Sequence, residues 1–384
     1  MIFLVIRFLS LIILIFFLFF CNISPCFAFG TSAKSAIVIN ALTGEVVYEK
    51  NARQKLPMAS TTKIMTAICA IENGNLDEIV KVHPKAVGVE GSSMYLGHDE
   101  QLPLRDLLYG LMLSSGNDAA VAIAMHISKS VEEFALLMNK TAAKIGVKNT
   151  AFKNPNGLDD EGHYTTAYDL AMITRYGMKN PEFSKVVGTQ SIKVGWQGRD
   201  YPRVLNNHNK LLKMYEGATG VKTGFTKKSG RCLVSSAKRD GLEFVAVTLN
   251  APDDWNDHIK MLDFAFDAYE SKEIIKKDEY LKTLKVLNGN VENISVASAS
   301  SFSVPVKKGS KPKIKLKYNI PETTEAPVGF GKALGSVEVY LDDSLAGKVD
   351  AVSKNSVSYV EPETFLKNII KIFKTWILMN RVAC

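Results

Sequence analysis

The chain has 384 residues and a formal net charge of +8, and 46% of its residues are hydrophobic and 22% are charged. This length excludes a single domain of average size and suffices for a well-buried core, and the composition is typical of a globular protein. The positive charge fits a polyanionic partner such as nucleic acid, acidic lipid or an acidic cell-wall polymer, and charge alone does not choose among them.

The first segment of the chain is an apolar run that predicts export. Residues 2–23 are almost continuously apolar, with Arg7 as the only charge, and the run ends in Ser24-Pro25-Cys26-Phe27-Ala28. Pro25 breaks a helix and Ala28 offers a small residue for cleavage, so we interpret residues 1–28 as a signal peptide cleaved after Ala28. The run is also long enough to cross a bilayer, which leaves an uncleaved membrane anchor as the alternative.

Cysteine usage predicts no disulfide framework, although the chain is expected to be exported. Of the five cysteines, Cys21 and Cys26 belong to the signal segment and Cys384 is terminal. Cys69 and Cys232 lie inside apolar stretches, where a buried free thiol is the usual state of cysteine.

Residues 29–271 are expected to form one α+β domain. A β-hairpin is predicted over 35–40 and 43–48, and a helix is predicted from Ser60 to Glu72. Further helices are predicted over 104–113, 118–128 and 131–145, a strand over 189–194, an antiparallel meander over 220–226, 231–237 and 244–249, and a closing helix over 258–269. Strands at both ends with helices between them predict one antiparallel sheet with flanking helices and an inserted helical subdomain.

The composition of the chain changes after about residue 272. Short stretches in which lysine, valine and serine alternate, such as 313–318 and 336–340, are separated by turn residues at regular intervals. This pattern predicts a small all-β sandwich domain over 272–362. We expect it to be non-catalytic, because it holds no constellation of histidines, cysteines or carboxylates.

The last segment, residues 363–384, is predicted to be a cationic amphipathic helix. Four basic residues fall on one face at helical spacing and apolar residues such as Phe365, Leu366 and Leu378 cover the rest; the basic residues are Lys367, Lys371, Lys374 and Arg381. Such a helix lies in a membrane interface more readily than it spans the bilayer. The alternative is a helix docked on the β-domain, but docked helices usually carry acidic residues on the wet face, and this one has none after Glu363.

Three short motifs carry the chemistry, and they occur in the order Ser60-Thr61-Thr62-Lys63, Ser115-Gly116-Asn117 and Lys222-Thr223-Gly224. Ser-x-x-Lys alone is weak, because it also occurs at Ser235 and Ser310. Pro312 interrupts the turn after Ser310, and Ser235 lies in a predicted strand, where residues three apart point to opposite faces. Only Ser60 opens a predicted helix.

At a helix start, residues three apart share a face, so the Lys63 amine can reach the Ser60 hydroxyl. The helix N-terminus also favours an oxyanion at the Ser60 amide. Lys63 can accept a proton at neutral pH only if burial and a second cation lower its basicity, and Lys222 is the candidate for that cation. Each motif alone has a structural explanation as a helix cap, a turn or a strand start, but together they indicate a serine acylase with a lysine base.

The three motifs, together with segments 154–159 and 206–212, resemble those of the low-molecular-mass penicillin-binding proteins that act as serine-type D-alanyl-D-alanine carboxypeptidases. Ser-Gly-Asn in place of Ser-Asp-Asn favours this branch over the β-lactamases. The resemblance covers nearly the whole chain. It implies a β-lactamase/transpeptidase-like α+β domain, then a small all-β sandwich domain and a C-terminal amphipathic helix.

The resemblance also implies a role for each motif residue. Ser60 attacks the carbonyl of the penultimate D-alanine, Lys63 takes its proton, and Ser115 relays a proton to the leaving D-alanine. Asn117 holds the substrate amide, while Lys222 and Thr223 bind the terminal carboxylate. Gly224 leaves room for the substrate along the strand edge, and the backbone amides of Ser60 and Phe225 form the oxyanion hole. Many relatives carry histidine in place of Phe225, and some carry arginine in place of His208, so substrate contacts at these two positions are open.

The implied enzyme is penicillin-sensitive, removes the terminal D-alanine from peptidoglycan stem pentapeptides, and is attached peripherally at the outer face of the cytoplasmic membrane. Its expected partners are peptidoglycan stem peptides, β-lactam antibiotics as covalent inhibitors, and the membrane surface through the C-terminal helix. No nucleic acid and no cofactor are expected. No metal is expected either, because the six histidines are scattered without ligand spacing.

Two other functions remain as alternatives. A β-lactamase would need a residue that positions a deacylating water, and segment 154–163 contains no Glu-x-x-x-Asn pattern, although Glu161 lies there. The second alternative is a non-catalytic wall-binding protein on an inherited enzyme fold. It does not explain why all the motif side chains that catalysis needs are present.

Overall fold

A computed structural model describes residues 30–381 of the chain. The predicted signal peptide, with Cys21 and Cys26, lies outside the described residues, and so does Cys384.

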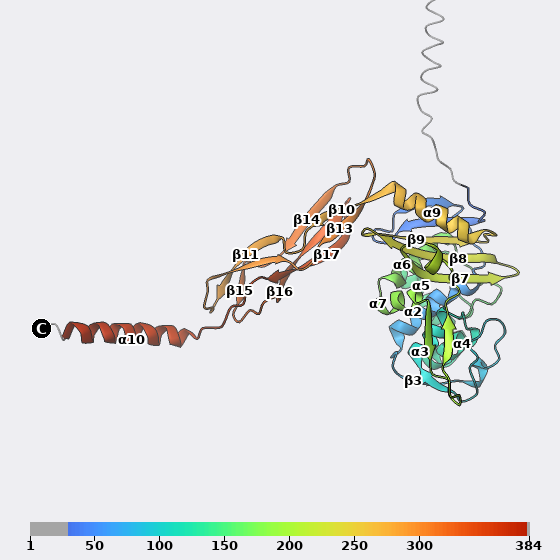
Figure 1. The fold of residues 1–384 in the computed structure, drawn as a ribbon, viewed down its shortest axis with the longest axis horizontal. Coiled ribbons are helices and arrows are strands. Elements are labelled where there is room, and N and C mark those ends of the chain that lie inside the picture. The colour runs from blue at the N-terminus through green and yellow to red at the C-terminus, as the bar shows by residue number, and fades with distance from the viewer. Residues whose placement is uncertain (1–29, 382–384) are drawn as a thin grey trace, which may run out of the picture. The chain divides into compact units, whose positions relative to one another are not determined.

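The first part of the described chain is built on one five-stranded sheet in which every neighbouring pair is antiparallel (Figure 1). Its strands are β1 (Ser35–Asn40), β2 (Val46–Lys50), β7 (Ala218–Thr226), β8 (Gly230–Arg239) and β9 (Leu242–Leu249), in the order β2-β1-β9-β8-β7. The prediction of one sheet assembled from strands at both ends of the domain is confirmed. Strand β7, which carries the Lys-Thr-Gly motif, lies at an edge of this sheet.

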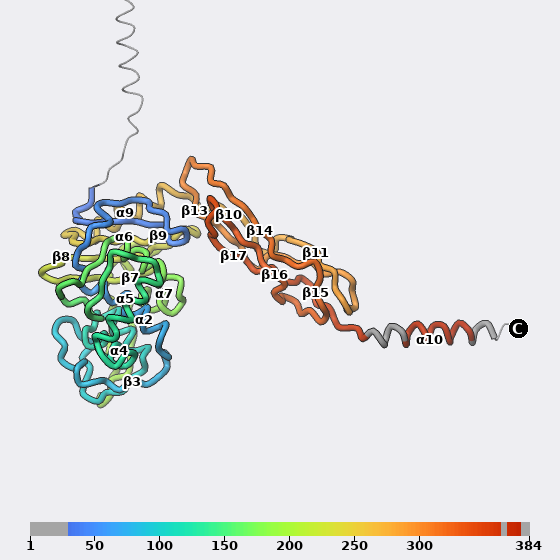
Figure 2. The backbone as a smooth tube through the Cα atoms, turned by 180° about the vertical axis from the view of Figure 1, so that it is seen from behind, coloured from blue at the N-terminus to red at the C-terminus, as the bar shows by residue number. Residues whose placement is uncertain are grey.

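Helices cover both faces of the sheet. They are α2 (Lys63–Asn73), α3 (Leu104–Met112), α4 (Asn117–Ser128), α5 (Val131–Ile145), α6 (Ala167–Met178), α7 (Pro181–Gly188), α8 (Leu211–Met214) and α9 (Asp254–Ala268). Helix α9 lies on one side of the sheet, and α2, α4 and α5 lie on the other side in both views (Figures 1 and 2). The helix limits follow local signals, since Ser130 caps α5 by accepting from the Glu133 amide at 3.0 Å and Gly146 ends it with φ +93°.

Short elements connect these helices. They are the 3-10 turns η1 (Ala59–Thr62) and η2 (Pro84–Ala86), the pair β3 (Ile79–Lys81) and β4 (Gln101–Pro103), and the pair β5 (Ser191–Val194) and β6 (Arg203–Asn206). The helix expected to start at Ser60 starts at Lys63, because η1 comes first.

Helix α2 runs through the main hydrophobic core, and its residues 63–70 are all buried. Apolar residues from α3, α4, α5, α6 and the sheet surround it in one continuous cluster. Cys69 and Cys232 are both fully buried free thiols, as predicted. The helix that carries Lys63 is therefore fixed on every side, and its side chains have little freedom to move.

The second part is all β, as predicted. Its strands are β10 (Tyr269–Ile275), β11 (Tyr280–Leu287), β12 (Asn293–Ser298), β13 (Phe302–Lys307), β14 (Ile314–Asn319), β15 (Thr323–Glu325), β16 (Ala333–Leu341) and β17 (Ser344–Ser353). Six strands form one sheet in the order β14-β16-β17-β12-β11-β15, and β10 pairs with β13 in a second sheet. Val304 and Val306 of β13 share a buried core with Val337 of β16 and Val349 of β17, which makes a sandwich. The proposed limit between residues 271 and 272 falls within β10.

Helix α10 (Pro362–Arg381) closes the described chain. Apolar side chains such as Ile372, Phe373 and Trp376 are 61–68% exposed, and Lys371 and Lys374 are exposed as well. The side chains of Phe365, Leu366, Leu378 and Arg381 lie outside the described set. Within residues 30–381, no helix combines the length and the apolar character that crossing a membrane requires.

Candidate active site

Ser60 lies in η1, a tight turn packed against edge strand β7. A Cβ atom at Gly224 would lie 3.0 Å from the Ser60 amide nitrogen and 3.1 Å from that of Thr61. Only a residue without a side chain lets the strand pass this close to the turn. Gly224 therefore has a structural function beside the one inferred from the sequence, because it lets β7 and the Ser60 turn lie side by side.

Lys63 is completely buried, and three oxygen atoms surround its amine. Its Nζ lies 3.0 Å from Ser60 Oγ, 2.6 Å from Asn117 Oδ1 and 2.6 Å from the Asn156 carbonyl oxygen. Carbonyl oxygens only accept hydrogen bonds, so a neutral amine must point both of its hydrogens at Asn117 and Asn156. Its lone pair then faces the Ser60 hydroxyl, which is the orientation that a general base requires.

The electrostatic surroundings of Lys63 favour that neutral form. Burial is the main cause that lowers the pKa of Lys63 well below its ordinary value, and the nearby Lys222 lowers it further, while Asp118 opposes both. Lys222 is itself 1% exposed, and burial lowers its pKa to about 7. Its Nζ donates to the Thr223 carbonyl at 2.8 Å.

The loop of residues 153–163 supplies the Asn156 carbonyl and is pinned to the start of α2. Thr66 Oγ1 donates to the Pro155 carbonyl at 2.6 Å. Gly157 has φ +88°, and a Cβ there would lie 1.9 Å from the Ala59 carbonyl oxygen. The loop therefore lies directly on the turn that carries Ser60.

His163 holds the other end of this loop. Its Nδ1 accepts from the Lys153 amide at 3.0 Å, so its hydrogen is on Nε2, which lies 2.8 Å from Thr62 Oγ1. Burial lowers the pKa of His163 to about 4, so it is neutral at pH 7. The ring connects the loop to the residue that precedes Lys63.

The Ser115-Gly116-Asn117 motif joins α3 to α4. Ser115 is 4% exposed and has φ +59°, a left-handed conformation that is strained for serine. The Asn117 side chain donates from Nδ2 to the Glu90 carbonyl at 2.6 Å, which fixes its Oδ1 toward Lys63. Both ends of the Asn117 amide thus have protein partners in this structure, and its contact with a substrate amide stays a prediction.

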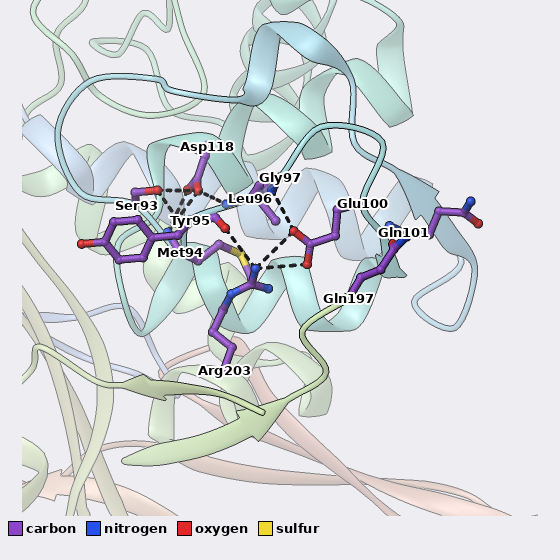
Figure 3. A network of polar contacts seen from close by, with 10 residues as sticks. All are labelled: Ser93, Met94, Tyr95, Leu96, Gly97, Glu100, Gln101, Asp118, Gln197 and Arg203. Atoms are coloured by element: carbon purple, nitrogen blue, oxygen red, sulfur yellow. Dashed lines mark hydrogen bonds and ion pairs between the residues drawn. The ribbon is translucent and has the colours of Figure 1, made fainter. Parts of the chain in front are cut away.

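The segment of residues 90–101 is held beside this motif by two carboxylates (Figure 3). Asp118 accepts from the backbone amides of Met94 and Leu96 at 3.0 and 3.1 Å, and from Ser93 Oγ at 2.6 Å. Glu100 forms a buried ion pair with Arg203 of β6 at 3.0 Å, in which both side chains are 4% exposed. Arg203 also donates to the Tyr95 carbonyl at 3.1 Å, so the hairpin of β5 and β6 supports the same segment.

A cleft of about 380 Å³ opens over Ser60. The residues that line it come from the motifs, from segments 90–101 and 206–212, and from β7, β8 and α9; they are Ser60, Ser92, Ser115, His208, Lys210, Thr223, Gly224, Phe225, Arg231, Asp254 and Trp255. Phe225 is 66% exposed at its rim. The cleft is large enough for a short extended peptide beside edge strand β7.

The structure brings the predicted site residues together and leaves the two other Ser-x-x-Lys serines elsewhere. Ser235 is fully buried and its Oγ lies 2.6 Å from Nδ1 of His258, while Ser310 donates to the Lys307 carbonyl in an exposed turn. The sequence did not point to the structural roles of Asp118 and His163. Asn156 lies in segment 154–159, which contributed to the family resemblance. Its contact with Lys63 is made by the backbone carbonyl, and the identity of a side chain does not reveal such a contact.

Nothing in the described part of the chain is arranged as a metal site. Within residues 30–381, no three side chains of histidine, cysteine, aspartate or glutamate are grouped as metal ligands would be.

Two family models match the chain. Residues 25–253 match the family described as D-alanyl-D-alanine carboxypeptidase, peptidase S11. Residues 269–359 match the C-terminal domain of penicillin-binding protein 5.

Individual relatives give the same result. The D-alanyl-D-alanine carboxypeptidase DacF of Bacillus subtilis is 37% identical over 348 residues, which are 87% of this chain and 88% of that protein. DacC of Escherichia coli, also a D-alanyl-D-alanine carboxypeptidase, is 30% identical over 82% of this chain and 81% of its own length. Among solved structures, DacD of Francisella tularensis matches with a TM-score of 0.61 at 28% identity, covering 86% of this chain and 95% of its own.

Proposed function

The chain belongs to the D-alanyl-D-alanine carboxypeptidase family, peptidase S11, and from this premise we propose that it cleaves the terminal D-alanine through an acyl-enzyme on Ser60, with Lys63 as the general base. The observation that carries this assignment is the surroundings of the Lys63 amine. Two carbonyl acceptors lie at 2.6 Å and the Ser60 hydroxyl at 3.0 Å. That arrangement holds a neutral amine with its lone pair toward the nucleophile.

In the acylation step, Lys63 accepts the proton of Ser60 as Oγ attacks the carbonyl carbon of the penultimate D-alanine. The oxyanion that forms accepts hydrogen bonds from the backbone amides of Ser60 and Phe225. The C–N bond then breaks, and the leaving D-alanine takes up the proton from Lys63 by way of Ser115, so Lys63 is neutral again. This leaves an ester between Ser60 and the shortened peptide.

In the deacylation step, water attacks the same ester carbonyl, and Lys63 accepts a proton from that water. The C–O bond to Ser60 breaks, and the proton returns to Oγ. The products are the shortened stem peptide and the free enzyme. A β-lactam acylates Ser60 in the same way, because its ring amide presents a strained carbonyl to the same nucleophile.

The substrate is proposed to bind as an extended peptide beside β7. Thr223 and Gly224 line the cleft from this strand, and Lys222 lies buried behind them. Thr223 and Lys222 are proposed to bind the terminal carboxylate, and Asn117 the substrate amide.

Neither alternative function is favoured. The relatives are carboxypeptidases by name, and the second domain matches a domain of penicillin-binding protein 5. Glu161 is exposed and is not among the residues that line the cleft, so it is not placed to activate a water beside Ser60.

The enzyme acts on the cell wall, outside the cytoplasm, as its relatives do. We further propose that α10 attaches it peripherally to the outer face of the cytoplasmic membrane. Exposed apolar side chains and exposed lysines on the same helix support this proposal, because they suit the boundary between acyl chains and anionic headgroups.

The test of the mechanism is covalent labelling with fluorescent penicillin together with release of D-alanine from a pentapeptide. Ser60→Ala is expected to lose both, while Ser235→Ala and Ser310→Ala keep both. Labelling of all three variants would show that the nucleophile lies elsewhere. Rapid turnover of penicillin without D-alanine release would identify a β-lactamase.

A further inference from the structure

A second cavity, separate from the cleft, lies at the end of helix α6. Its volume is about 270 Å³, and in the described part of the chain it shares no lining residue with the cleft. The turn between β1 and β2, the end of α6 and the turn between β8 and β9 contribute to its walls. We call this cavity the basic pocket, because its polar side chains include three cations; they are Asn40, Arg175, Lys179, Lys238 and Glu243.

Arg175 is held at the wall of the basic pocket by backbone carbonyls. Its Nε donates to the Ala41 carbonyl at 2.8 Å, and its Nη2 donates to the Leu42 carbonyl at 2.5 Å. A Cβ atom at Gly44 would lie 3.4 Å from Cζ of Arg175, so the guanidinium group rests on the turn between β1 and β2. These carbonyls are uncharged, and they leave the Nη1 end of the guanidinium group for a ligand.

Two lysines add positive charge to the same pocket. Lys179 follows Arg175 by four positions, and like charges at this spacing on a helix repel each other. Lys238 of β8 lies opposite Glu243 of β9, which is the one acidic residue of the pocket wall. The ion pairs found within residues 30–381 include none of the three cations. Burial lowers the pKa of Lys179, and the charge of Arg175 lowers it further, as expected for cations without a counter-charge.

Asn40 contributes a donor that the described protein does not use. It is 1% exposed, and its Oδ1 accepts from the backbone amides of Leu42 at 2.9 Å and Thr43 at 3.0 Å. These two amides fix the orientation of the side chain, because Nδ2 cannot accept in place of Oδ1. Nδ2 itself has no hydrogen-bond partner within the described chain. A buried donor without a partner is destabilising, and an oxygen atom of a ligand would remove that cost.

The basic pocket therefore combines hydrogen-bond donors with an excess of positive charge. We infer that it binds a phosphate group, with Arg175, Lys179 and Lys238 as the cations. A phosphate ester carries about −1.5 to −2 charges at pH 7, and its three tetrahedral oxygens accept from donors on different elements. A carboxylate has two oxygens in one plane, so fewer of these donors could reach it. Free phosphate and a phosphate ester present the same group, and this site does not depend on the proposed function.

The test is isothermal titration of the full chain with inorganic phosphate, glycerol phosphate and acetate at constant ionic strength. The unmodified protein is expected to bind both phosphates and to bind acetate at least about tenfold more weakly. Tighter binding of glycerol phosphate would assign the site to an ester, and tighter binding of inorganic phosphate would assign it to the free ion. Either result supports the site.

Lys179→Gln with Lys238→Gln should weaken phosphate binding at least about tenfold, because it removes two charged donors. Both lysines are exposed, so the fold should be kept. Glu243→Gln should strengthen phosphate binding severalfold, since it removes the negative charge of the pocket wall, and a damaged fold would not produce such a gain. Acylation of Ser60 by penicillin should be unchanged in these variants, because the cleft is separate.

Lys148→Gln with Lys185→Gln is the matched control, because both lysines are exposed and neither lines the basic pocket. It should leave phosphate binding unchanged. The inference would be overturned by an equal loss in this control, by unchanged binding in the pocket double variant, by acetate binding as tight as that of phosphate, or by no phosphate binding to the unmodified protein. A chain that binds phosphate but is not acylated by penicillin would contradict only the proposed function.

Discussion

The protonation state of a single amine governs this site at the scale of residues. As the proposed general base, Lys63 must be neutral to accept the proton of Ser60, yet an isolated lysine is charged at neutral pH. Burial supplies most of the shift, and the positive charge of Lys222 supplies more. The same burial explains why the two carbonyl contacts matter, because an amine without partners in this interior would be destabilised.

Lys222→Met is expected to move the acid limb of the pH–rate profile to higher pH. The rate of penicillin acylation falls with decreasing pH as Lys63 becomes protonated. Removal of the neighbouring charge raises the pKa of Lys63, so protonation, and with it the loss of rate, begins at higher pH. The measurement is kcat/KM for acylation as a function of pH.

Lys228→Met makes the same change at an exposed lysine of the adjacent turn and should leave the limb where it is. An acid limb that does not move in Lys222→Met would show that Lys222 does not contribute to the pKa of Lys63.

At the scale of elements, the site depends on how closely a loop and a strand approach the start of α2, and on how segment 90–101 is held beside α4. Glycine permits two of these contacts, at Gly224 in β7 and at Gly157 in the loop of residues 153–163. Segment 90–101 is tied to α4 through Asp118, and its Glu90 carbonyl holds the Asn117 side chain that contacts Lys63. These elements position backbone groups around Lys63, so their effect on catalysis comes through packing.

Gly157→Ala is expected to lower the acylation rate about 10- to 100-fold, by moving the Asn156 carbonyl away from Lys63. The added Cβ would lie 1.9 Å from the Ala59 carbonyl oxygen, so the backbone must move. The measurements are kcat/KM for penicillin acylation and the midpoint of thermal unfolding.

Gly162→Ala is the matched control in the same loop. Gly162 also has a positive φ, +82°, but a Cβ there meets only the flexible end of Lys153, at 3.1 Å. It should cost about 1 kcal/mol of stability through backbone strain and keep the acylation rate. Equal rate losses in the two variants would indicate that strain, and not displacement of the carbonyl, is responsible.

A buried histidine of α9 forms hydrogen bonds with the sheet, and its titration makes the free energy of unfolding depend on pH. His258 lies with Nδ1 2.6 Å from Ser235 Oγ and Nε2 3.0 Å from Thr248 Oγ1, and burial lowers its pKa to about 3. Between pH 6.5 and about pH 3 the unfolded chain therefore binds a proton that the folded chain does not. For this group, the free energy of unfolding falls by about 1.4 kcal/mol for each unit by which the pH is lowered in that range.

Denaturant titrations of the full chain between pH 6.5 and 4.5 test this dependence. His258→Gln should reduce the acid slope by about one proton, whereas His98→Gln at an exposed position should leave it unchanged. An unchanged slope in His258→Gln would contradict the assignment.

At the scale of the whole molecule, the chain combines an enzyme domain, a β-sandwich and an amphipathic helix, and the cleft residues identified within the described part of the chain belong to the first of these. The proposed function of the helix is to place the enzyme at the membrane surface. In α10, Phe373 and Trp376 pack edge to face with ring centroids 6.2 Å apart, and both remain exposed. Aromatic side chains of this kind favour the interface between membrane and water.

Lys371→Gln with Lys374→Gln is expected to weaken binding to vesicles with anionic lipid roughly thirtyfold at low salt, at about 1 kcal/mol per lysine. Binding to neutral vesicles should change little. The measurement is sedimentation of the full chain with vesicles of each composition.

Lys307→Gln with Lys308→Gln removes the same charge from the end of β13 and should leave vesicle binding unchanged. An equal loss in this control would assign the attraction to overall charge. Deletion of residues 365–384 should release an active enzyme from membranes, and continued sedimentation would point to a retained N-terminal anchor.

Sequence patterns determined much of this protein without a structure. Hydrophobic periodicity located the helix over 131–145 and the meander that became β7, β8 and β9, because periodicity reports which face of an element is buried. The order of the three motifs and the helix that follows Ser60 indicated the acylating serine. The cationic spacing near the C-terminus predicted α10.

Only the tertiary structure decided how Lys63 is surrounded and which cations share the basic pocket. Lys63 and the Asn156 carbonyl are 93 positions apart in the chain, and Arg175 and the Ala41 carbonyl are 134 apart. Contacts over such separations depend on which surfaces the folded chain brings together, and a backbone carbonyl carries no side-chain signal. Periodicity and motifs describe neighbours along the chain, whereas proton transfer and anion binding depend on neighbours in space.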